Sequence, residues 1–346
     1  MPAVAIAQAL SRKDPEGQVL YIGRRGGLEE RVVPRYGIPF ATIAAAKVDM
    51  EEPWRNWPLP FVLPRAFWEA WRLIRWFRPD VVLGTGGYVS APVVLVAAGL
   101  RYPVVLQEQN YRPGRSTRLL ARFARSVAVA YAGSSDYLDS VPTVVTGTPV
   151  RSDFQHRKTE YPDQPRRLLV LGGSQGAHRI NLAVAEALPQ FLARPEVTVA
   201  HQTGPRDIGA MEGVKAELAP DARKRYEPFA FAEELAPRLL ASDLVLTRAG
   251  GSALSEISAV GVPMIIVPGP FAGGHQRLNA TPFAEAGAAV IIPDEDCRGA
   301  RLAAEVGAIL DDGDRYRRMV TAISGVGRPQ AADDVVGVLQ RAVASR

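Results

Sequence analysis

Residues 168–177 read LLVLGGSQGA, and this stretch decides the fold of the region around it. Four consecutive apolar residues run into a glycine-rich turn, and a helical pattern follows from about Ala177 to Leu192. A short continuous apolar run is typical of a strand in a parallel sheet, because helices cover both faces of such a sheet. The stretch therefore predicts a strand, a tight turn and a helix of an α/β domain.

The same alternation of short apolar runs and helical patterns recurs along the chain, with a polar, proline-containing break at 151–166. Strands are predicted at 18–22, 81–83, 103–106, 127–130, 143–145, 168–171, 197–201, 244–247, 264–267 and 288–292. These two series predict an α/β protein with two Rossmann-like, doubly wound parallel-sheet domains, over 1–150 and 151–330, and a cleft between them.

Composition narrows the class of protein. A chain of 346 residues is long enough for two domains. A single cysteine, Cys297, excludes a disulfide framework and a cysteine-rich zinc site. We expect neither a signal peptide nor a membrane-spanning segment, because no apolar run reaches the roughly 18 residues that crossing a bilayer requires.

The net charge of +5 is unevenly distributed. Residues 1–150 carry 18 basic and 12 acidic side chains, whereas residues 151–346 carry 23 and 24. The basic excess therefore lies in the first domain, and it favours an anionic surface as the partner of that domain alone.

The first domain lacks the element with which a βαβ unit begins. The chain opens directly on a helical pattern at 2–13, with no apolar strand before it. We therefore expect an inner strand of the first sheet, and the loop that would follow that strand, to be missing.

Three glycine-rich turns follow predicted strands, at 84–90 (GTGGYVS), 172–177 (GGSQGA) and 249–256 (AGGSALSE). Each turn would present backbone amides and a helix N-terminus to an anion. Any one of them could be a tight turn that merely needs glycine. Together they favour a ligand that carries a diphosphate, although none fits a P-loop or a complete dinucleotide motif.

Polar side chains near these turns have two interpretations each. Glu256 can accept ribose hydroxyls, or it can simply complement a helix dipole. Arg151 can bind a phosphate, or it can be an exposed linker charge. Gln276 and Asn279, close to His275, can bind sugar hydroxyls or stabilise their own loop.

All five tryptophans fall within residues 54–76, interleaved with arginines. Tryptophan favours the bilayer interface and arginine pairs with lipid phosphates, so the segment indicates a membrane contact. The alternative is an ordinary amphipathic helix, for which Phe67, Trp71 and Ile74 have the spacing of core residues. The predicted patch comprises Trp68, Trp71, Arg72, Arg75 and Trp76.

A second set of arginines recurs every three or four residues, as expected for one face of a helix: Arg112, Arg115, Arg118, Arg122 and Arg125. Nucleic acid is the rival partner for such a stripe, but no nucleic-acid-binding motif accompanies it. We therefore expect lipid and not nucleic acid.

Metal chemistry finds little support in the sequence. The four histidines are not spaced as ligand pairs. The acidic run at 294–296 resembles a metal motif of some sugar transferases, but a solvated loop is the favoured interpretation. We expect neither a metal nor a cofactor.

Seven segments together resemble the MurG family, which transfers N-acetylglucosamine from UDP-N-acetylglucosamine to lipid I in bacterial peptidoglycan synthesis. They are PAVAIAQAL (2–10), PDVVLGTGGYVSAP (79–92), EQN (108–110), GTPVR (147–151), LLVLGGSQGA (168–177), RAGGSALSE (248–256) and HQRLNA (275–280). The resemblance implies a GT-B fold in which the C-terminal helix, 331–346, returns to the first domain.

The resemblance also implies partners. The first domain would bind lipid I and anionic lipids at the cytoplasmic face of the cell membrane, as a peripheral protein. The second domain would bind UDP-N-acetylglucosamine, and other enzymes of cell-wall synthesis are possible partners.

The resemblance assigns residues to each substrate. Donor contacts would fall on Arg151, Ser174, Ala232, Gly251, Ser252, Ala253, Leu254, Ser255, Glu256 and Gln276. The acceptor side of the cleft would use Gly86, Gly87, Tyr88 and Asn110. Inverting transfer would follow, with an acceptor hydroxyl attacking the anomeric carbon while UDP leaves, and no metal is needed if helix N-termini and arginine stabilise the developing charge.

The chain departs from the family pattern at its start. The family carries a Gly-Thr-Gly-Gly-His loop before the segment that matches residues 1–3, and the histidine of that loop is its favoured general base. We expect that the true start lies upstream, and that the chain as written has a poorly stable first domain and little activity. Glu108 is then the remaining acid–base candidate.

Smaller departures and rival functions remain. The family usually has Thr at Ala253, a larger aliphatic residue at Ala232 and often His at Gln107. The alternatives to a lipid I transferase are a related glycolipid transferase, a UDP-sugar epimerase or an inactive membrane-bound scaffold.

Overall fold

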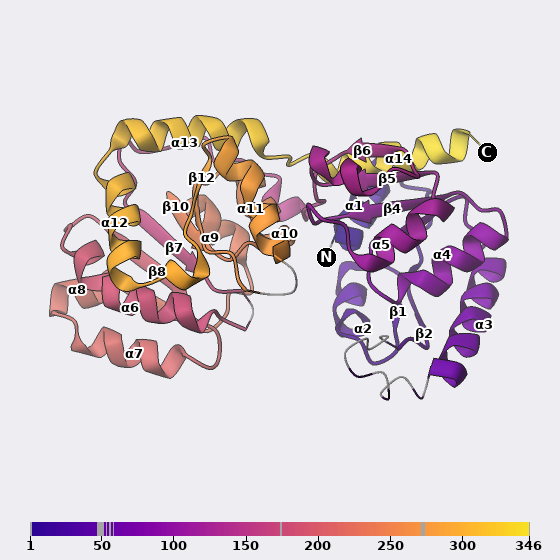
Figure 1. Cartoon of the computed structure of the whole chain (residues 1–346), viewed down its shortest axis with the longest axis horizontal. Helices are drawn as coiled ribbons and strands as arrows, with labels where there is room; N and C mark the ends of the chain where they lie inside the picture. The colour runs from indigo at the N-terminus through magenta and orange to yellow at the C-terminus, as the bar shows by residue number, and fades with distance from the viewer. Residues whose placement is uncertain are drawn as a thin grey trace. The chain divides into compact units, whose positions relative to one another are not determined.

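The computed structural model describes residues 2–46, 52, 54, 57, 59–173, 175–270 and 274–345. Two compact units make up the chain (Figure 1). The first unit comprises Met1–Ser152 together with Gln330–Arg346, and the second unit comprises Asp153–Pro329. Every strand pair in the described residues is parallel. The prediction of two parallel-sheet α/β domains is therefore confirmed.

The second unit contains one six-stranded sheet in the order β12-β11-β10-β7-β8-β9. Its strands are β7 (Arg167–Leu171), β8 (Thr198–Gln202), β9 (Tyr226–Phe229), β10 (Leu244–Thr247), β11 (Met264–Ile266) and β12 (Ala289–Ile291). Counted in chain order from the β9 edge, the strands run 3-2-1-4-5-6. In this topology the connections leave the two central strands in opposite directions, so a crevice opens at the carboxyl ends of β7 and β10.

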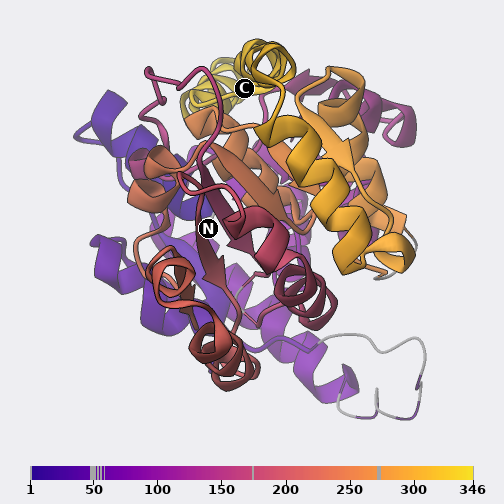
Figure 2. The same ribbon diagram turned by 90° about the vertical axis from the view of Figure 1, so that its left-hand side faces the viewer.

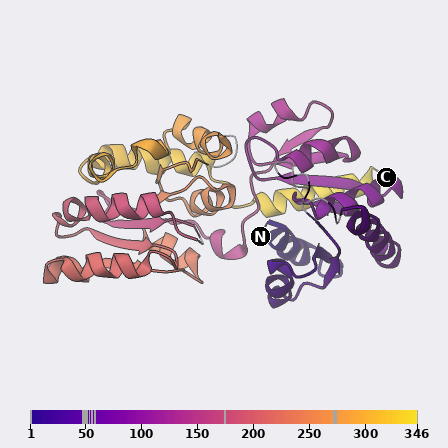
Figure 3. The ribbon, with the colours of Figure 1, turned by 60° about the horizontal axis from the view of Figure 1, so that its bottom comes forward.

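Helices lie on both sides of this sheet (Figures 2 and 3). They are α6 (His178–Leu192), α7 (Ile208–Glu217), α8 (Pro220–Lys224), α9 (Leu235–Ala241), α10 (Gly251–Val260), α11 (His275–Glu285), α12 (Gly299–Leu310) and α13 (Gly313–Val326). Leu168 and Val170, alternate residues of β7, share a buried core with Phe191 of α6 and Val306 of α12. Strand residues are apolar on both faces because both faces are covered, which explains the unbroken apolar run of the sequence.

The first unit has its strands in two separate parallel sheets. One sheet pairs β1 (Tyr21–Arg24) with β2 (Phe40–Ile43), and the other has the order β3-β4-β5-β6. The strands of the second sheet are β3 (Val82–Gly84), β4 (Val104–Glu108), β5 (Ser126–Val129) and β6 (Thr143–Val145). Numbered as in the second unit, the two sheets read 3-2 and 4-5-6-7, and no described residue fills position 1 between them. This is the inner strand that the sequence analysis expected to be missing.

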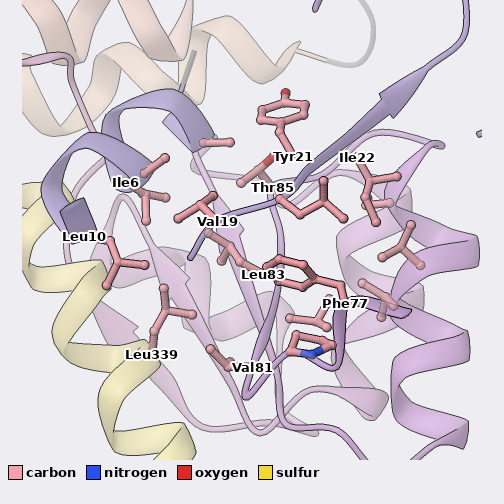
Figure 4. A pocket seen from close by; sticks show the side chains of 18 of the residues that line it. Ile6, Leu10, Val19, Tyr21, Ile22, Phe77, Val81, Leu83, Thr85 and Leu339 are labelled. Atoms are coloured by element: carbon pink, nitrogen blue, oxygen red, sulfur yellow. The ribbon is translucent and has the colours of Figure 1, made fainter. Parts of the chain in front are cut away.

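A cavity of about 1290 Å³ in the first unit is lined by residues of both of its sheets. Its lining is largely apolar (Figure 4). Ile6 and Leu10 come from α1 (Pro2–Lys13), Tyr21 from β1, Leu83 from β3 and Leu339 from α14 (Ala331–Ala344). Apolar side chains that would normally be covered by a central strand thus line an open space.

The C-terminal helix α14 packs against α1 in the first unit. Ile6 and Ala9 of α1 share a buried core with Val335 and Leu339 of α14 and with Val105 of β4. Helices α1 and α14 thus cover one face of the β3-β4-β5-β6 sheet. The opposite face of this sheet packs against α3 (Leu59–Phe77) and α4 (Ser90–Gly99). The unit also contains the short helices α2 (Leu28–Val32) and α5 (Arg115–Leu120). None of the helices among the described residues has both the length and the apolar character that crossing a membrane requires.

Two strands, β2 and β9, escaped the sequence analysis, and one predicted strand was misplaced. β9 is an edge strand that contains Pro228, and proline is tolerated at edges although it disrupts the sequence pattern of a strand. The strand predicted at 18–22 is observed as β1, Tyr21–Arg24.

The predicted arginine stripe was wrong as a single helical face. Helix α5 spans only Arg115–Leu120, and a 3₁₀ turn at Ala121–Phe123 ends it. Arg112 therefore precedes the helix and Arg122 lies in the 3₁₀ turn. Arg125 follows both, and its guanidinium donates to the Ala342 carbonyl of α14 at 2.9 Å.

Candidate functional site

Two glycine-rich turns of the second unit flank the crevice at the switch point of its sheet. Gly172 to Ala177 connects β7 to α6, and Arg248 to Gly250 connects β10 to α10. Because β7 and β10 are adjacent and parallel, both turns and both helix N-termini lie at the same edge of the sheet. Backbone amides at two helix N-termini form an environment suited to an anion such as a diphosphate.

The turn after β7 is shaped by contacts that only glycine permits. Gly176 has φ of 79° and Gly204, after β8, has φ of 82°. A Cβ atom on Gly176 would collide with the Thr203 carbonyl, and one on Gly204 would lie 2.6 Å from the Gly176 nitrogen. The two backbones thus pack directly on each other. Ser174, a predicted donor contact in this turn, lies outside the described residues.

Gln276 ties together the turns after β10 and β11. Its side-chain oxygen accepts hydrogen bonds from the Ala249 nitrogen at 3.2 Å and the Gly269 nitrogen at 2.7 Å. Asn279 donates to the Ala249 carbonyl at 3.3 Å. The structure thus shows the loop-stabilising role for both side chains. Contact of Gln276 with a sugar stays a prediction.

The remaining predicted donor residues of the second unit lie on α10, except for Ala232. Ser252, Ala253, Ser255 and Glu256 are partly exposed, whereas Gly251 is buried. Ala232, partly exposed, follows β9 at the same edge of the sheet. Leu254 is fully buried, and a donor contact for it stays a prediction. Its side chain fills the core beneath the helix, and only its backbone remains for a contact.

Asp294, in the acidic run considered as a metal motif, is engaged by cations of the protein. Its carboxylate forms ion pairs with Arg248 and Arg179, and its carbonyl accepts from Arg179 at 2.9 Å. Within the described residues, no three acidic, histidine or cysteine side chains gather as a metal site. Asp294 instead joins the turn after β12 to Arg248 at the end of β10.

Glu108, the candidate acid–base residue, is 5% exposed at the end of β4 and holds the loop that follows. One carboxylate oxygen accepts from the Asn110 backbone nitrogen at 3.0 Å and from its side-chain nitrogen at 3.1 Å. The other accepts from the Gly114 nitrogen at 2.9 Å and the Thr117 hydroxyl at 2.6 Å. These four bonds account for a buried carboxylate and position Asn110. An acid–base role for Glu108 stays a prediction.

The glycine loop predicted to face the acceptor borders the cavity of the first unit. Gly86, Gly87 and Tyr88 all line it. Gly86 and Gly87 have φ of 86° and 78°, and the Ser90 hydroxyl donates to both of their carbonyls, at 2.9 and 2.8 Å. The loop therefore has a defined shape beside the vacant strand position.

Arg151 belongs to the first unit, although it was predicted to start the second domain. The division falls after Ser152, and the Arg151 guanidinium donates to the Tyr36 hydroxyl at 3.1 Å. The polar stretch at 151–166 marked the linker in the sequence but did not show which unit would hold the arginine. A phosphate contact for Arg151 stays a prediction.

Helix α3 turns an aromatic face outward. Ala66, Glu69, Ala70 and Ile74 are its buried residues, and the Glu69 carboxylate accepts from the Ala44 backbone nitrogen at 2.6 Å. The five tryptophans of the chain are between 46% and 74% exposed: Trp54, Trp57, Trp68, Trp71 and Trp76. The core interpretation of Trp71 was therefore wrong, because a different stripe of α3 faces the sheet.

Arginines lie over the rings of this exposed face. The Arg72 guanidinium is 5.1 Å from the ring centre of Trp68, and that of Arg75 is 5.9 Å from the ring centre of Trp71. Such cation–π contacts place cationic groups directly beside large apolar surfaces. We call Trp68, Trp71, Arg72, Arg75 and Trp76 the α3 patch.

A buried polar network lies beneath the turn after β7. His201 of β8 contacts the Tyr226 hydroxyl through Nδ1 at 2.9 Å and the Asn181 side-chain oxygen through Nε2 at 3.0 Å. Burial lowers the pKa of His201 to about 4, against a smaller opposing effect of the Asp207 carboxylate. No local pattern in the sequence indicates this network, because its members are far apart along the chain.

The stability of the second unit should depend on pH through His201. An unfolded chain binds a proton at this histidine near pH 6.5, whereas the folded chain binds it only near pH 4. The free energy of unfolding should therefore fall by about 3 kcal/mol as pH drops from 6.5 to 4. Denaturant unfolding at several pH values measures this effect. In His201→Gln that part of the slope should vanish, and an unchanged slope would contradict the assignment.

Comparison with known proteins agrees with the geometry. The N-terminal domain of glycosyltransferase family 28 matches residues 1–129, and the C-terminal domain of that family matches residues 167–335. A UDP-N-acetylglucosamine--N-acetylmuramyl-(pentapeptide) pyrophosphoryl-undecaprenol N-acetylglucosamine transferase of Moorella thermoacetica is 39% identical, over 99% of this chain and 96% of the relative. The protein of that name from Anaeromyxobacter dehalogenans is 37% identical, over 100% of this chain and 90% of the relative.

Solved structures show the same fold. MurG of Acinetobacter baumannii is similar with a TM-score of 0.78 at 26% identity, over 98% of this chain and 95% of that one. A UDP-GlcNAc 2-epimerase of Neisseria meningitidis, bound to UDP-GlcNAc, has a TM-score of 0.70 at 14% identity, over 98% and 96% of the two chains. The second likeness shows the architecture alone.

Proposed function

The chain belongs to glycosyltransferase family 28, and on this basis we propose that it transfers N-acetylglucosamine from UDP-N-acetylglucosamine to lipid I, giving lipid II. The observation that carries the proposal is the pair of glycine-rich turns at the switch point of the second unit. Each turn leads into a helix N-terminus, and both lie where a doubly wound sheet binds nucleotides. Of the donor residues expected from the family, Ala232, the start of α10 and Gln276 follow strands at this same edge of the sheet.

The reaction needs little covalent chemistry from the protein. A lipid I hydroxyl attacks the anomeric carbon, a new carbon–oxygen bond forms, and the bond to the UDP oxygen breaks with inversion. Amides at the N-termini of α6 and α10 stabilise the charge that develops on the leaving diphosphate. The acceptor proton must pass to a general base. The described residues offer Glu108 for this role, although its carboxylate also holds the loop that bears Asn110.

The α3 patch supports a peripheral location at the cytoplasmic face of the cell membrane. Exposed tryptophan rings favour the bilayer interface, and arginines beside them attract anionic headgroups. A membrane-bound acceptor such as lipid I requires the enzyme to work at this surface. An epimerase that acts on a free nucleotide sugar has no such requirement, so the patch favours the transferase.

The direct test is product formation. Purified protein is incubated with labelled UDP-N-acetylglucosamine and lipid I in detergent micelles, and labelled lipid II is separated by chromatography. Label in the lipid fraction that depends on lipid I supports the proposal. Conversion of UDP-N-acetylglucosamine to UDP-N-acetylmannosamine, without any lipid product, would instead identify an epimerase.

Removing the Glu256 carboxylate should weaken the binding of UDP. Glu256→Ala deletes an acceptor for the ribose hydroxyls, and lost hydrogen bonds to a charged group cost about 1–3 kcal/mol. Titration calorimetry with UDP measures the difference between the two proteins. Glu285→Ala, an exposed glutamate at the end of α11, is the matched control. Equal UDP affinity in Glu256→Ala and the control would remove Glu256 from the site.

A further inference from the structure

The network around His201 has a defined direction of hydrogen bonding. The Asn181 side-chain nitrogen donates to the Thr203 carbonyl at 2.8 Å and to Asp207 at 2.7 Å. The Asn181 oxygen must therefore accept, so Nε2 of His201 carries the proton that it donates. Nδ1 of the neutral ring then accepts from the Tyr226 hydroxyl. The direction of each hydrogen bond in this series is therefore set by the neighbouring hydrogen bond.

This network ends at the Thr203 carbonyl, against which the glycine turn after β7 packs. The Thr203 carbonyl, which Asn181 holds, is the group that leaves room only for glycine at position 176. One residue earlier, the Gln202 side-chain nitrogen donates to the Gly173 carbonyl at 3.0 Å. The end of β8 therefore contacts both described limbs of the turn, at Gly173 and at Gly176.

The network is more than the sheet itself requires. β8 already pairs along its length with β7 and β9, and the Thr203 nitrogen donates to the Phe229 carbonyl at 2.9 Å. Asn181 and His201 are nevertheless completely buried, and buried polar side chains are costly unless every hydrogen bond is made. An apolar pair would cover the same face of the sheet but could not fix the position of a carbonyl.

We infer that Asn181, supported by His201, is a positioning residue for the donor diphosphate, acting through Thr203 and Gly176 on the turn between β7 and α6. This inference rests on the proposed function, and it names residues that touch no substrate. Asn181 holds the Thr203 carbonyl in place, and this carbonyl restricts the position of Gly176 in the turn. The backbone amides of the turn are then already oriented when the diphosphate binds. A preset loop loses less conformational freedom when the anion binds.

The decisive measurement compares two ligands that differ only in phosphate. Asn181→Ala should weaken binding of UDP by about tenfold, the order expected when a buried hydrogen bond that orders a loop is lost. Binding of uridine, which lacks the diphosphate, should be unchanged. In turnover, the KM for UDP-N-acetylglucosamine should rise while the KM for lipid I stays the same. A merely structural role would not separate the two ligands.

Two further variants complete the test. Tyr161→Phe removes a 2.8 Å hydrogen bond to the Gly261 carbonyl in the same unit, away from the turn, and should leave UDP binding unchanged. Gln202→Leu removes the contact with Gly173 and should act like Asn181→Ala; it decides the question if the alanine variant does not fold. Unchanged UDP affinity, or equal loss for UDP and uridine, would overturn the inference. Failure of the unaltered protein to bind UDP would instead overturn the proposed function.

Discussion

Fusing a β-strand and a Gly-Thr-Gly-Gly-His turn ahead of Pro2 is expected to raise the rate of lipid II formation by about 10²- to 10⁴-fold, which is the usual contribution of a general base. The turn sequence is the one that the family resemblance implies. The strand would enter the cavity of the first unit, which residues of both β1 and β3 line. The histidine at its carboxyl end would then stand at the same edge of the sheet as the glycine loop of Gly86 and Gly87.

The cavity gives the physical reason to expect that such a strand binds. Its lining includes Leu10 of α1, Tyr21 of β1, Leu83 of β3 and Leu339 of α14 (Figure 4). A strand of about five β-branched residues suits a central position in a parallel sheet. Burying about two of its side chains should add roughly 3–6 kcal/mol to the free energy of unfolding of the first unit.

Two versions of the extension separate folding from chemistry. An extension with alanine in place of its histidine should give the same gain in stability, measured by denaturant unfolding, but no gain in rate. An extension with proline in the middle of the strand should give neither gain. Equal rates with histidine and alanine would place the general base elsewhere, and Glu108→Gln in the unextended chain would then be the next variant to assay.

Strands that are apolar on both faces could be predicted from the sequence, because they appear as short, continuous apolar runs. The run at 168–171 became β7 almost residue for residue. The apolar pattern did not indicate β9, because Pro228 interrupts it. At the edge of the sheet, where β9 lies, a proline is tolerated. That no described residue supplies a strand between the two sheets of the first unit agrees with an order of elements that opens on a helix.

The site was predictable in its turns and not in its side-chain partners. Glycine-rich turns after strands are local signals. Whether Glu108 acts on a substrate or holds its own loop depends on Gly114 and Thr117, which approach only in the folded chain. The contact between Asn181 and His201 joins α6 to β8, and no spacing in the sequence indicates it. The same limit applies to Trp71. The helical period allowed two different sides of α3 to be the buried one, and only packing against the sheet decides between them.

Replacing the three tryptophans of the α3 patch should abolish most of the membrane binding. In Trp68→Gln, Trp71→Gln, Trp76→Gln, each lost indole should remove on the order of 1–2 kcal/mol of interfacial binding. The triple variant should therefore bind vesicles about 10²- to 10⁴-fold more weakly. Because these side chains are exposed, the fold and the binding of UDP should be unchanged. Co-sedimentation with vesicles that contain anionic phospholipid measures the loss.

The arginines of the α3 patch should contribute through electrostatic attraction to anionic headgroups. Their effect therefore distinguishes binding to anionic lipid from non-specific hydrophobic adsorption. Arg72→Gln, Arg75→Gln should weaken binding to anionic vesicles by about 1 kcal/mol per arginine, with little effect on neutral vesicles and less effect at high salt. Phe231→Gln, an aromatic residue 57% exposed in the second unit, is the matched control and should bind like the unaltered protein. If the tryptophan variant sediments as well as this control, α3 is not the membrane face. The choice of a lipid-linked acceptor over a free nucleotide sugar would then lose its structural support.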